Sequence, residues 1–154
     1  MGKTPNAPTC LKRINSQIMG KEVKSAITCS KAKTNSPRRI LVVDDDNNTR
    51  QLSVAALINA GYEVESSKDG SAGWEELQIR VYDLVVTDNH MPRLTGMEMI
   101  AKLRSAHMSI PIILATRSLP TNIIAHNPWL KPNASLQRPC SNDDLVATVK
   151  EVLH

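Results

Sequence analysis

The chain has 154 residues, of which 41% are hydrophobic and 22% charged, which is typical of one soluble globular domain with a core of its own. No run of about 18 apolar residues and no apolar N-terminal signal occurs, so we expect a cytoplasmic protein with no membrane partner. The net charge of +4 is uneven, because residues 1–39 hold nine Lys or Arg and one acid, whereas residues 40–154 hold ten Lys or Arg and fourteen acids.

Residues 1–38 are predicted to form a basic tail or linker. They are rich in Lys, Ser, Thr and Asn and contain few large apolar residues, so they can bury little surface. A short helix around Leu11–Met19 is one option, since Leu11, Ile14 and Ile18 share a helical face. The positive charge lies on this tail and the folded part is mildly acidic, so we do not expect nucleic acid to be a partner.

From Ile40 onwards, short apolar runs of β type alternate with amphipathic helical stretches, the pattern of βαβ units around a parallel sheet. The predicted strands are Ile40–Val43, Tyr62–Ser66, Leu84–Thr87, Ile110–Ala115 and Ser135–Gln137. The predicted helices are Thr49–Ala60, Ser71–Arg80, Gly96–Ala106 and Asp143–Leu153, with Gly61 as a C-cap and Ser141 or Asn142 as an N-cap.

The segment Ser118–Asn133 is the exception to this regular pattern. Its prolines, Pro120, Pro128 and Pro132, leave room for only a turn or two of helix around Thr121–His126. Its geometry does not follow from the sequence.

Acidic residues follow two of the predicted strands at the point where each strand ends. Asp44, Asp45 and Asp46 follow the first strand, and Asp88 follows the third. Ligands of open α/β sheets bind beyond the carboxyl ends of the strands, so these acids are expected to meet at one edge. Taken singly, each group could equally consist of solvated turn or N-cap residues.

Crowded carboxylates repel one another, and an oxygen-liganded dication such as Mg²⁺ relieves that repulsion. The same cation would offset the charge of an incoming phosphoryl group, and Asp88 could then form an acyl phosphate. Thr116 and Arg138 follow the fourth and fifth strands, where a hydroxyl and a cation can contact phosphoryl oxygens.

These acids belong to a wider pattern. It consists of Ile40–Asp46, Tyr82–Pro92, Gly96, Pro111–Thr116, and Arg138-Pro139 followed by Leu145. Through this pattern, residues from about Arg39 to Leu153 resemble the receiver domain of two-component response regulators, the CheY-like family. The resemblance implies a flavodoxin-like (βα)5 fold for residues 39–154, with a five-stranded parallel sheet of order 2-1-3-4-5.

The resemblance also implies roles for individual residues. Asp88 matches the phosphoacceptor, Thr116 the switch hydroxyl, and Arg138 stands where the family has Lys. Lys131 is a rival match, but it lies only fifteen residues after Thr116, too few for a helix and a strand, whereas Arg138 lies twenty-two after it.

The expected cofactor is Mg²⁺ or Mn²⁺. By resemblance, Asp45 is a direct metal ligand, and Asp44 acts partly through water. The backbone carbonyl of His90 matches the third protein ligand, and Asp88 also belongs to the metal site. The side chain of His90 is expected to be exposed in a loop.

Several positions depart from the family pattern. Arg138 replaces a compact ammonium with a larger planar group, which is not a conservative change at a tight site. Cys140 stands where the family often has Phe, and Ser135 where its switch aromatic often lies. We therefore expect slower phosphorylation or a weaker switch.

The main functional prediction is a signalling switch that receives a phosphoryl group from a histidine kinase or a histidine phosphotransfer protein and changes partner binding. We expect no conventional multiple-turnover enzyme, because such a domain promotes only its own phosphorylation and dephosphorylation. We also expect no output domain after Leu153, so the chain is either a stand-alone receiver or a piece of a hybrid kinase.

Two alternatives remain. One is a pseudo-receiver that binds partners without being phosphorylated, with Arg138 as the feature in its favour. The other is a haloacid-dehalogenase-type phosphatase with Asp44 as nucleophile and Asp46 as acid/base, although Asn48 stands where that motif needs Thr.

Overall fold

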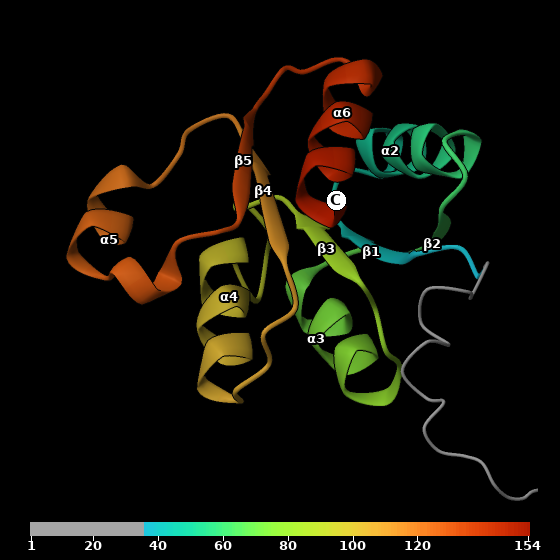
Figure 1. Cartoon of the computed structure of the whole chain (residues 1–154). Coiled ribbons are helices and arrows are strands. Elements are labelled where there is room, and N and C mark those ends of the chain that lie inside the picture. Colours follow the sequence, from blue (N-terminus) through green and yellow to red (C-terminus); the bar gives the residue numbers. More distant parts are fainter. Residues whose placement is uncertain (1–35) are drawn as a thin grey trace, which may run out of the picture. The chain divides into compact units, whose positions relative to one another are not determined.

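A five-stranded parallel sheet of order β2-β1-β3-β4-β5 forms the centre of this computed structural model, which describes residues 36–154 (Figure 1). The strands are β1 (Arg39–Val43), β2 (Glu63–Ser67), β3 (Leu84–Thr87), β4 (Ile112–Thr116) and β5 (Ala134–Gln137). The strand order predicted from the family resemblance is confirmed. The suggested helix at Leu11–Met19 lies outside the described residues.

Five α-helices and one 3₁₀ helix connect or follow the strands. They are α2 (Asn47–Asn59), α3 (Gly70–Ile79), α4 (Gly96–Ser105), α5 (Thr121–His126), η2 (Pro128–Leu130) and α6 (Asn142–Leu153). The four longer helices that were predicted are all present, and their ends differ from the predicted ones by at most two residues. None of the described helices is both long enough and apolar enough to cross a membrane.

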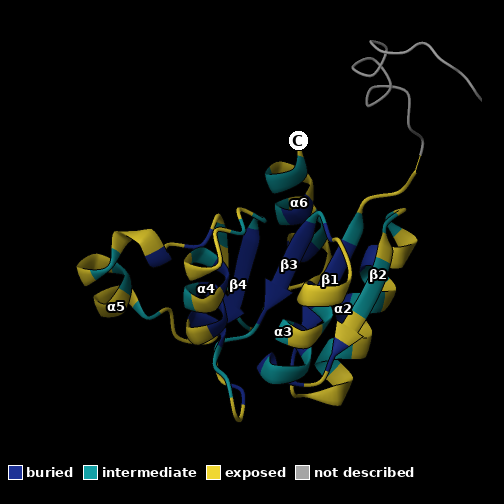
Figure 2. Ribbon diagram, turned by 90° about the horizontal axis from the view of Figure 1, so that it is seen from below, coloured by how far each residue is buried: buried dark blue, intermediate teal, exposed yellow. Residues whose placement is uncertain are grey.

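Helices cover both faces of the sheet, α2 and α6 on one and α3 and α4 on the other (Figure 1). Successive residues of a strand point to opposite faces, so Ile40 and Val42 join the cluster with α2 and α6, and Leu41 and Val43 join the cluster with α3 and α4. Both faces of β1, β3 and β4 are therefore buried (Figure 2). This explains why these strands are almost continuously aliphatic.

The helix ends follow from local sequence. Ser141 is the N-cap of α6 and forms a capping box with Asp144, which decides between the two predicted caps. Helix α2 ends with Ala60 as its C-cap, and Gly61 follows with φ +100, a conformation that glycine adopts without strain. The C-cap is thus Ala60, one residue before the predicted cap Gly61.

The connection between β4 and β5 differs from the other connections. Helix α5 has the bounds suggested for the short helix, Thr121–His126, but none of its residues is buried. It lies at the periphery and is mostly exposed (Figures 1 and 2). Leu130 of η2 instead contributes to the core beside α4. Because prolines limit the length of α5, this helix does not cover the sheet as the other helices do.

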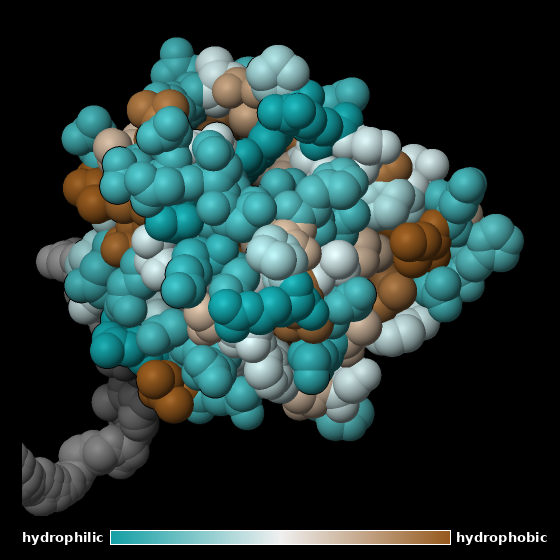
Figure 3. All heavy atoms as spheres, turned by 180° about the vertical axis from the view of Figure 1, so that it is seen from behind, coloured by the Kyte–Doolittle hydropathy of each residue, from teal (hydrophilic) through white to brown (hydrophobic). Residues whose placement is uncertain are grey.

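The surface opposite to that seen in Figure 1 is mostly hydrophilic, with hydrophobic residues in small separate areas (Figure 3). Scattered exposed apolar side chains are ordinary on soluble domains. This view therefore singles out no extended apolar surface.

The core assignment can be tested on two adjacent residues of α2. Leu57 is fully buried, whereas Ile58 is 52% exposed. We expect Leu57→Ala to lower the free energy of unfolding by about 2–5 kcal/mol, because it leaves a cavity under the helix. Ile58→Ala should lower it by less than about 1 kcal/mol. Urea denaturation measures both, and equal losses would contradict this packing of α2.

The capping box of α6 predicts a pH dependence. Hydrogen bonds from the Ser141 N–H and hydroxyl group hold the pKa of Asp144 below its usual value. A carboxyl whose pKa is lowered by folding stabilises the protein above its unfolded-state pKa, and this contribution disappears as the pH falls through its folded-state pKa. Asp144→Asn should therefore destabilise the protein near neutral pH, and its difference from wild type should shrink below about pH 4.

The matched control is Asp143→Asn, in the same exposed turn but outside the capping box. Urea denaturation at several pH values measures the effect. The same pH dependence for both variants would show that the capping box is not its source.

Candidate functional site

The three predicted acidic ligands converge at the carboxyl edge of the sheet. Val43 of β1 pairs with Thr87 of β3, so Asp44 and Asp88, the next residues, begin side by side. One carboxylate oxygen from each of Asp44, Asp45 and Asp88 lies within 4.8 Å of the others. Asp44 is buried, Asp88 partly buried and Asp45 exposed, so the cluster runs from the sheet to the surface.

Backbone contacts fix the position of Asp88. Its N–H donates to the Val43 carbonyl at 3.1 Å, and the Thr87 hydroxyl donates to its carbonyl oxygen at 2.9 Å. Gly96 at the start of α4 approaches the same carbonyl so closely that a Cβ there would lie 2.4 Å from the oxygen. The glycine in the predicted motif is therefore explained by this close approach.

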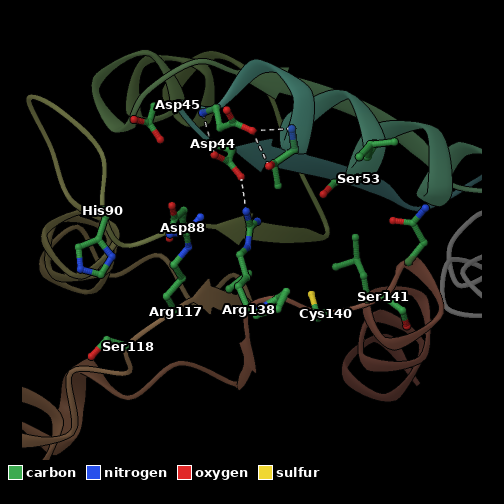
Figure 4. A pocket seen from close by; sticks show the side chains of 17 residues that line it. Asp44, Asp45, Ser53, Asp88, His90, Arg117, Ser118, Arg138, Cys140 and Ser141 are labelled. Carbon is green, nitrogen blue, oxygen red and sulfur yellow. Dashed lines mark hydrogen bonds and ion pairs between the residues drawn. The ribbon is translucent and has the colours of Figure 1, made fainter.

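Arg138 reaches from the end of β5 to the most buried acid of the cluster. Its Nη1 lies 2.8 Å from Oδ2 of Asp44, and its side chain is only 15% exposed (Figure 4). The structure thus brings Arg138 into the site, whereas the rival Lys131 follows η2 before β5 begins. Of the two residues weighed by sequence spacing, Arg138 is thus the one that lies at the acidic cluster.

The environment of Asp88 disfavours its charged form. Burial is the main cause that raises the pKa of the Asp88 carboxyl above its usual value, and the neighbouring Asp44 raises it further. The Asn89 N–H, which donates to Oδ1 at 2.7 Å, and the positive charge of Arg138 act in the opposite direction. A cation beside Asp88 would favour its ionised, nucleophilic form.

Thr116, the predicted switch residue, is the last residue of β4 and is buried. Its hydroxyl lies 3.3 Å from Nδ1 of His90, at the limit of hydrogen bonding, and 3.4 Å from both the N–H and the carbonyl of Ser118. The expectation that His90 is exposed is met, but its contact with Thr116 was not foreseen. The position of His90, two residues after Asp88, does not indicate that its side chain contacts a residue of another strand.

Asp46 has a structural role next to the cluster. Its carboxylate caps α2 by accepting from the Thr49 N–H at 2.8 Å and from the Thr49 hydroxyl, and these bonds lower its pKa. A carboxylate that holds a helix cap is poorly placed to serve as a general acid. This observation does not favour the phosphatase alternative.

A cleft of about 850 Å³ joins these residues to the N-terminus of α6. The acidic cluster lies at one end, and Cys140 and Ser141 lie toward the other (Figure 4).

Two arginines that the sequence analysis did not single out belong to the site. Arg117 lines the cleft, and Arg50 donates to the Asp44 carbonyl at 2.8 Å. The position of Arg117 directly after Thr116 is the signal that could have revealed it.

The donor set fits a hard divalent cation. Mg²⁺ and Mn²⁺ prefer oxygen ligands, and three carboxylates within reach of one another supply oxygens and negative charge. The predicted carbonyl ligand, that of His90, belongs to the loop directly after β3, and His90 lines the same cleft.

Comparisons with known proteins agree with this fold. The family model for the response regulator receiver domain matches residues 40–150. The transcriptional regulatory protein DltR of Streptococcus agalactiae is 30% identical over 112 residues, which are 73% of this chain and 50% of DltR. This chain therefore spans about half the length of that relative.

Two solved structures are similar over most of their length. The chemotaxis protein CheY4 of Vibrio cholerae has 28% identity and a TM-score of 0.71, and the match covers 77% of this chain and 100% of that one. The response regulator TrrA of Thermotoga maritima, solved in complex with Mg²⁺-BeF, has 30% identity and a TM-score of 0.66, and the match covers 75% of this chain and 99% of that one.

A doubly wound parallel sheet with an acidic cluster at its carboxyl edge defines the class of this domain. Within that class, the chain belongs to the family of response regulator receiver domains of two-component signalling.

The Arg138–Asp44 ion pair makes a testable contribution to stability. Removal of one partner of a buried ion pair leaves an uncompensated charge, so Arg138→Met should lower the free energy of unfolding by about 3 kcal/mol. Asp44→Asn should remove most of that penalty when the two changes are combined. Urea denaturation in a chelator measures this double-mutant cycle. Additive effects would show that the pair is not coupled in solution.

Proposed function

We propose that residues 39–154 are the phosphoacceptor receiver of a two-component phosphorelay, joined to a basic linker or tail of residues 1–38. The phosphoryl group comes from a histidine kinase or a histidine phosphotransfer protein and is accepted by Asp88. The observation that carries the proposal is the placement of Asp88 beside Asp44, Asp45 and Arg138 in one cleft.

In the proposed reaction, a carboxylate oxygen of Asp88 attacks the phosphorus of a phosphohistidine. A new O–P bond forms, the P–N bond breaks, and its electron pair returns to the imidazole of the donor. Mg²⁺ held by Asp44, Asp45, Asp88 and the His90 carbonyl would offset the negative charge brought together in this step.

The remaining residues position and read the phosphoryl group. Arg138 supplies donors for phosphoryl oxygens, and Thr116 supplies the hydroxyl that senses them. The Thr116 hydroxyl would have to leave its contacts with His90 and Ser118 to do so. Such a movement would alter the surface formed by the β4–β5 connection, and through it the binding of a downstream protein.

Intact-mass measurement after incubation with acetyl phosphate and Mg²⁺ tests the proposal. Attack by Asp88 breaks the bond between phosphorus and the acetate oxygen and releases acetate, so the chain should gain one phosphoryl group. Asp88→Asn should gain none, and a chelator should abolish the gain in wild type. Asp143→Asn, outside the site, serves as the matched control and should behave as wild type.

A gain that persists in Asp88→Asn would place the acceptor elsewhere. If neither acetyl phosphate nor a phosphorylated histidine kinase modifies the wild-type chain, the pseudo-receiver function replaces the phosphoacceptor. The presence of Arg138 in place of Lys is the feature that favours this second candidate.

A further inference from the structure

The two carboxylate oxygens of Asp44 have different surroundings. Oδ1 accepts a hydrogen bond from the Asp46 N–H at 2.9 Å. Oδ2 forms an ion pair with Nη1 of Arg138 at 2.8 Å but has no hydrogen-bond partner among residues 36–154. A divalent cation at the acidic cluster needs lone pairs of the same carboxylate, and it would also repel the guanidinium. Arg138 and the cation would therefore compete for the carboxylate of Asp44.

The ion pair is well protected from water. Asp44 is 1% exposed, and charges in such a site interact more strongly than on the surface. The backbone of Arg138 is held in place, because its N–H donates to the Thr116 carbonyl at 3.0 Å. Rotation of the Arg138 side chain can separate the pair while this backbone hydrogen bond is kept.

The guanidinium of Arg138 is only partly used by Asp44. Its Nε is buried and has no hydrogen-bond partner among residues 36–154. A buried donor without a partner is costly, and a guanidinium can bind two anionic oxygens at once. Figure 4 shows Arg138 below Asp44, as it also shows Asp88. Oxygens of a phosphoryl group on Asp88 are the acceptors that such a group would match.

We infer that Arg138 is an internal counter-ion of Asp44 that competes with the divalent cation for this carboxylate and so weakens metal binding. The inference rests on the metal-dependent site of the proposed function. It makes Arg138 a regulator of that site as well as a phosphoryl contact. A guanidinium released from Asp44 when this carboxylate holds a cation would be available to phosphoryl oxygens. Metal binding and phosphoryl binding are thereby coupled through one side chain.

Calorimetric titration of the full chain with Mg²⁺ alone tests the competition without any phosphoryl donor. Arg138→Met should bind Mg²⁺ at least about tenfold more tightly than wild type, because the cation no longer has to break a buried ion pair. Arg117→Met is the matched control, since it removes a positive charge from the same cleft without removing an ion pair to Asp44. Its Kd should stay within about threefold of the wild-type value.

A second background separates competition for Asp44 from a general electrostatic effect. In Asp44→Asn the carboxylate is absent, so the further change Arg138→Met should no longer tighten Mg²⁺ binding. Equal tightening in both backgrounds, or equal tightening by Arg117→Met, would overturn the inference in favour of long-range charge. If Arg138→Met does not fold, Arg138→Gln replaces it, with tightening expected in the same direction.

The two proposals fail in different ways. Mg²⁺ binding that is the same in wild type and Arg138→Met overturns the competition and leaves the proposed receiver function intact. Binding by Arg138→Met alone supports the competition strongly. Absence of Mg²⁺ binding in every variant overturns both the competition and the metal-dependent function.

Discussion

Mutual repulsion of carboxylates at the carboxyl edge of the sheet is the constraint on which the site depends. Asp44, Asp45 and Asp88 are brought together by the pairing of β1 with β3, a consequence of burying two aliphatic strands side by side. The free energy of core formation therefore maintains a concentration of negative charge that solvent would otherwise disperse. Arg138 offsets part of this charge within the protein, and a divalent cation would offset the rest. The ion pair between Arg138 and Asp44 reduces the excess of negative charge in this way.

Much of the fold followed from the sequence because its signals are local and repeated. Aliphatic runs such as Ile40–Val43 and Leu84–Thr87 have the length of buried strands, and the helices between them have polar caps such as Ser141. Convergence of the acids was predictable for the same reason, since parallel strands end at a common edge. The strand order was different, because it came from resemblance to a family and not from any pattern in the residues.

Contacts between side chains on different strands could not be foreseen. Nothing in the sequence indicates that His90 lies against Thr116 or that Arg138 reaches Asp44, since both contacts depend on rotamers within the folded cleft. The place of α5 also escaped prediction. Prolines fixed its length, but whether a short helix packs on the sheet depends on how much apolar surface it can bury, and α5 buries none of its residues. The sequence thus predicted which segments are helices and strands, but not how α5 and these side chains pack in the folded domain.

Because α5 lies at the periphery, substitutions in it should affect folding less than substitutions in the core of the domain. The buried residues of the sheet and of the other helices are constrained, because changes there disturb the core that aligns the acids. Apart from Ile124, which packs against the core, the residues of α5 are free of that demand, so their sequence can change with little effect on folding. Recognition of a new downstream protein could therefore arise in this connection alone, while the chemistry at the other strand ends stays as it is. Under the proposed function, the residues that accept the phosphoryl group and the residues that recognise a partner could therefore change independently of each other.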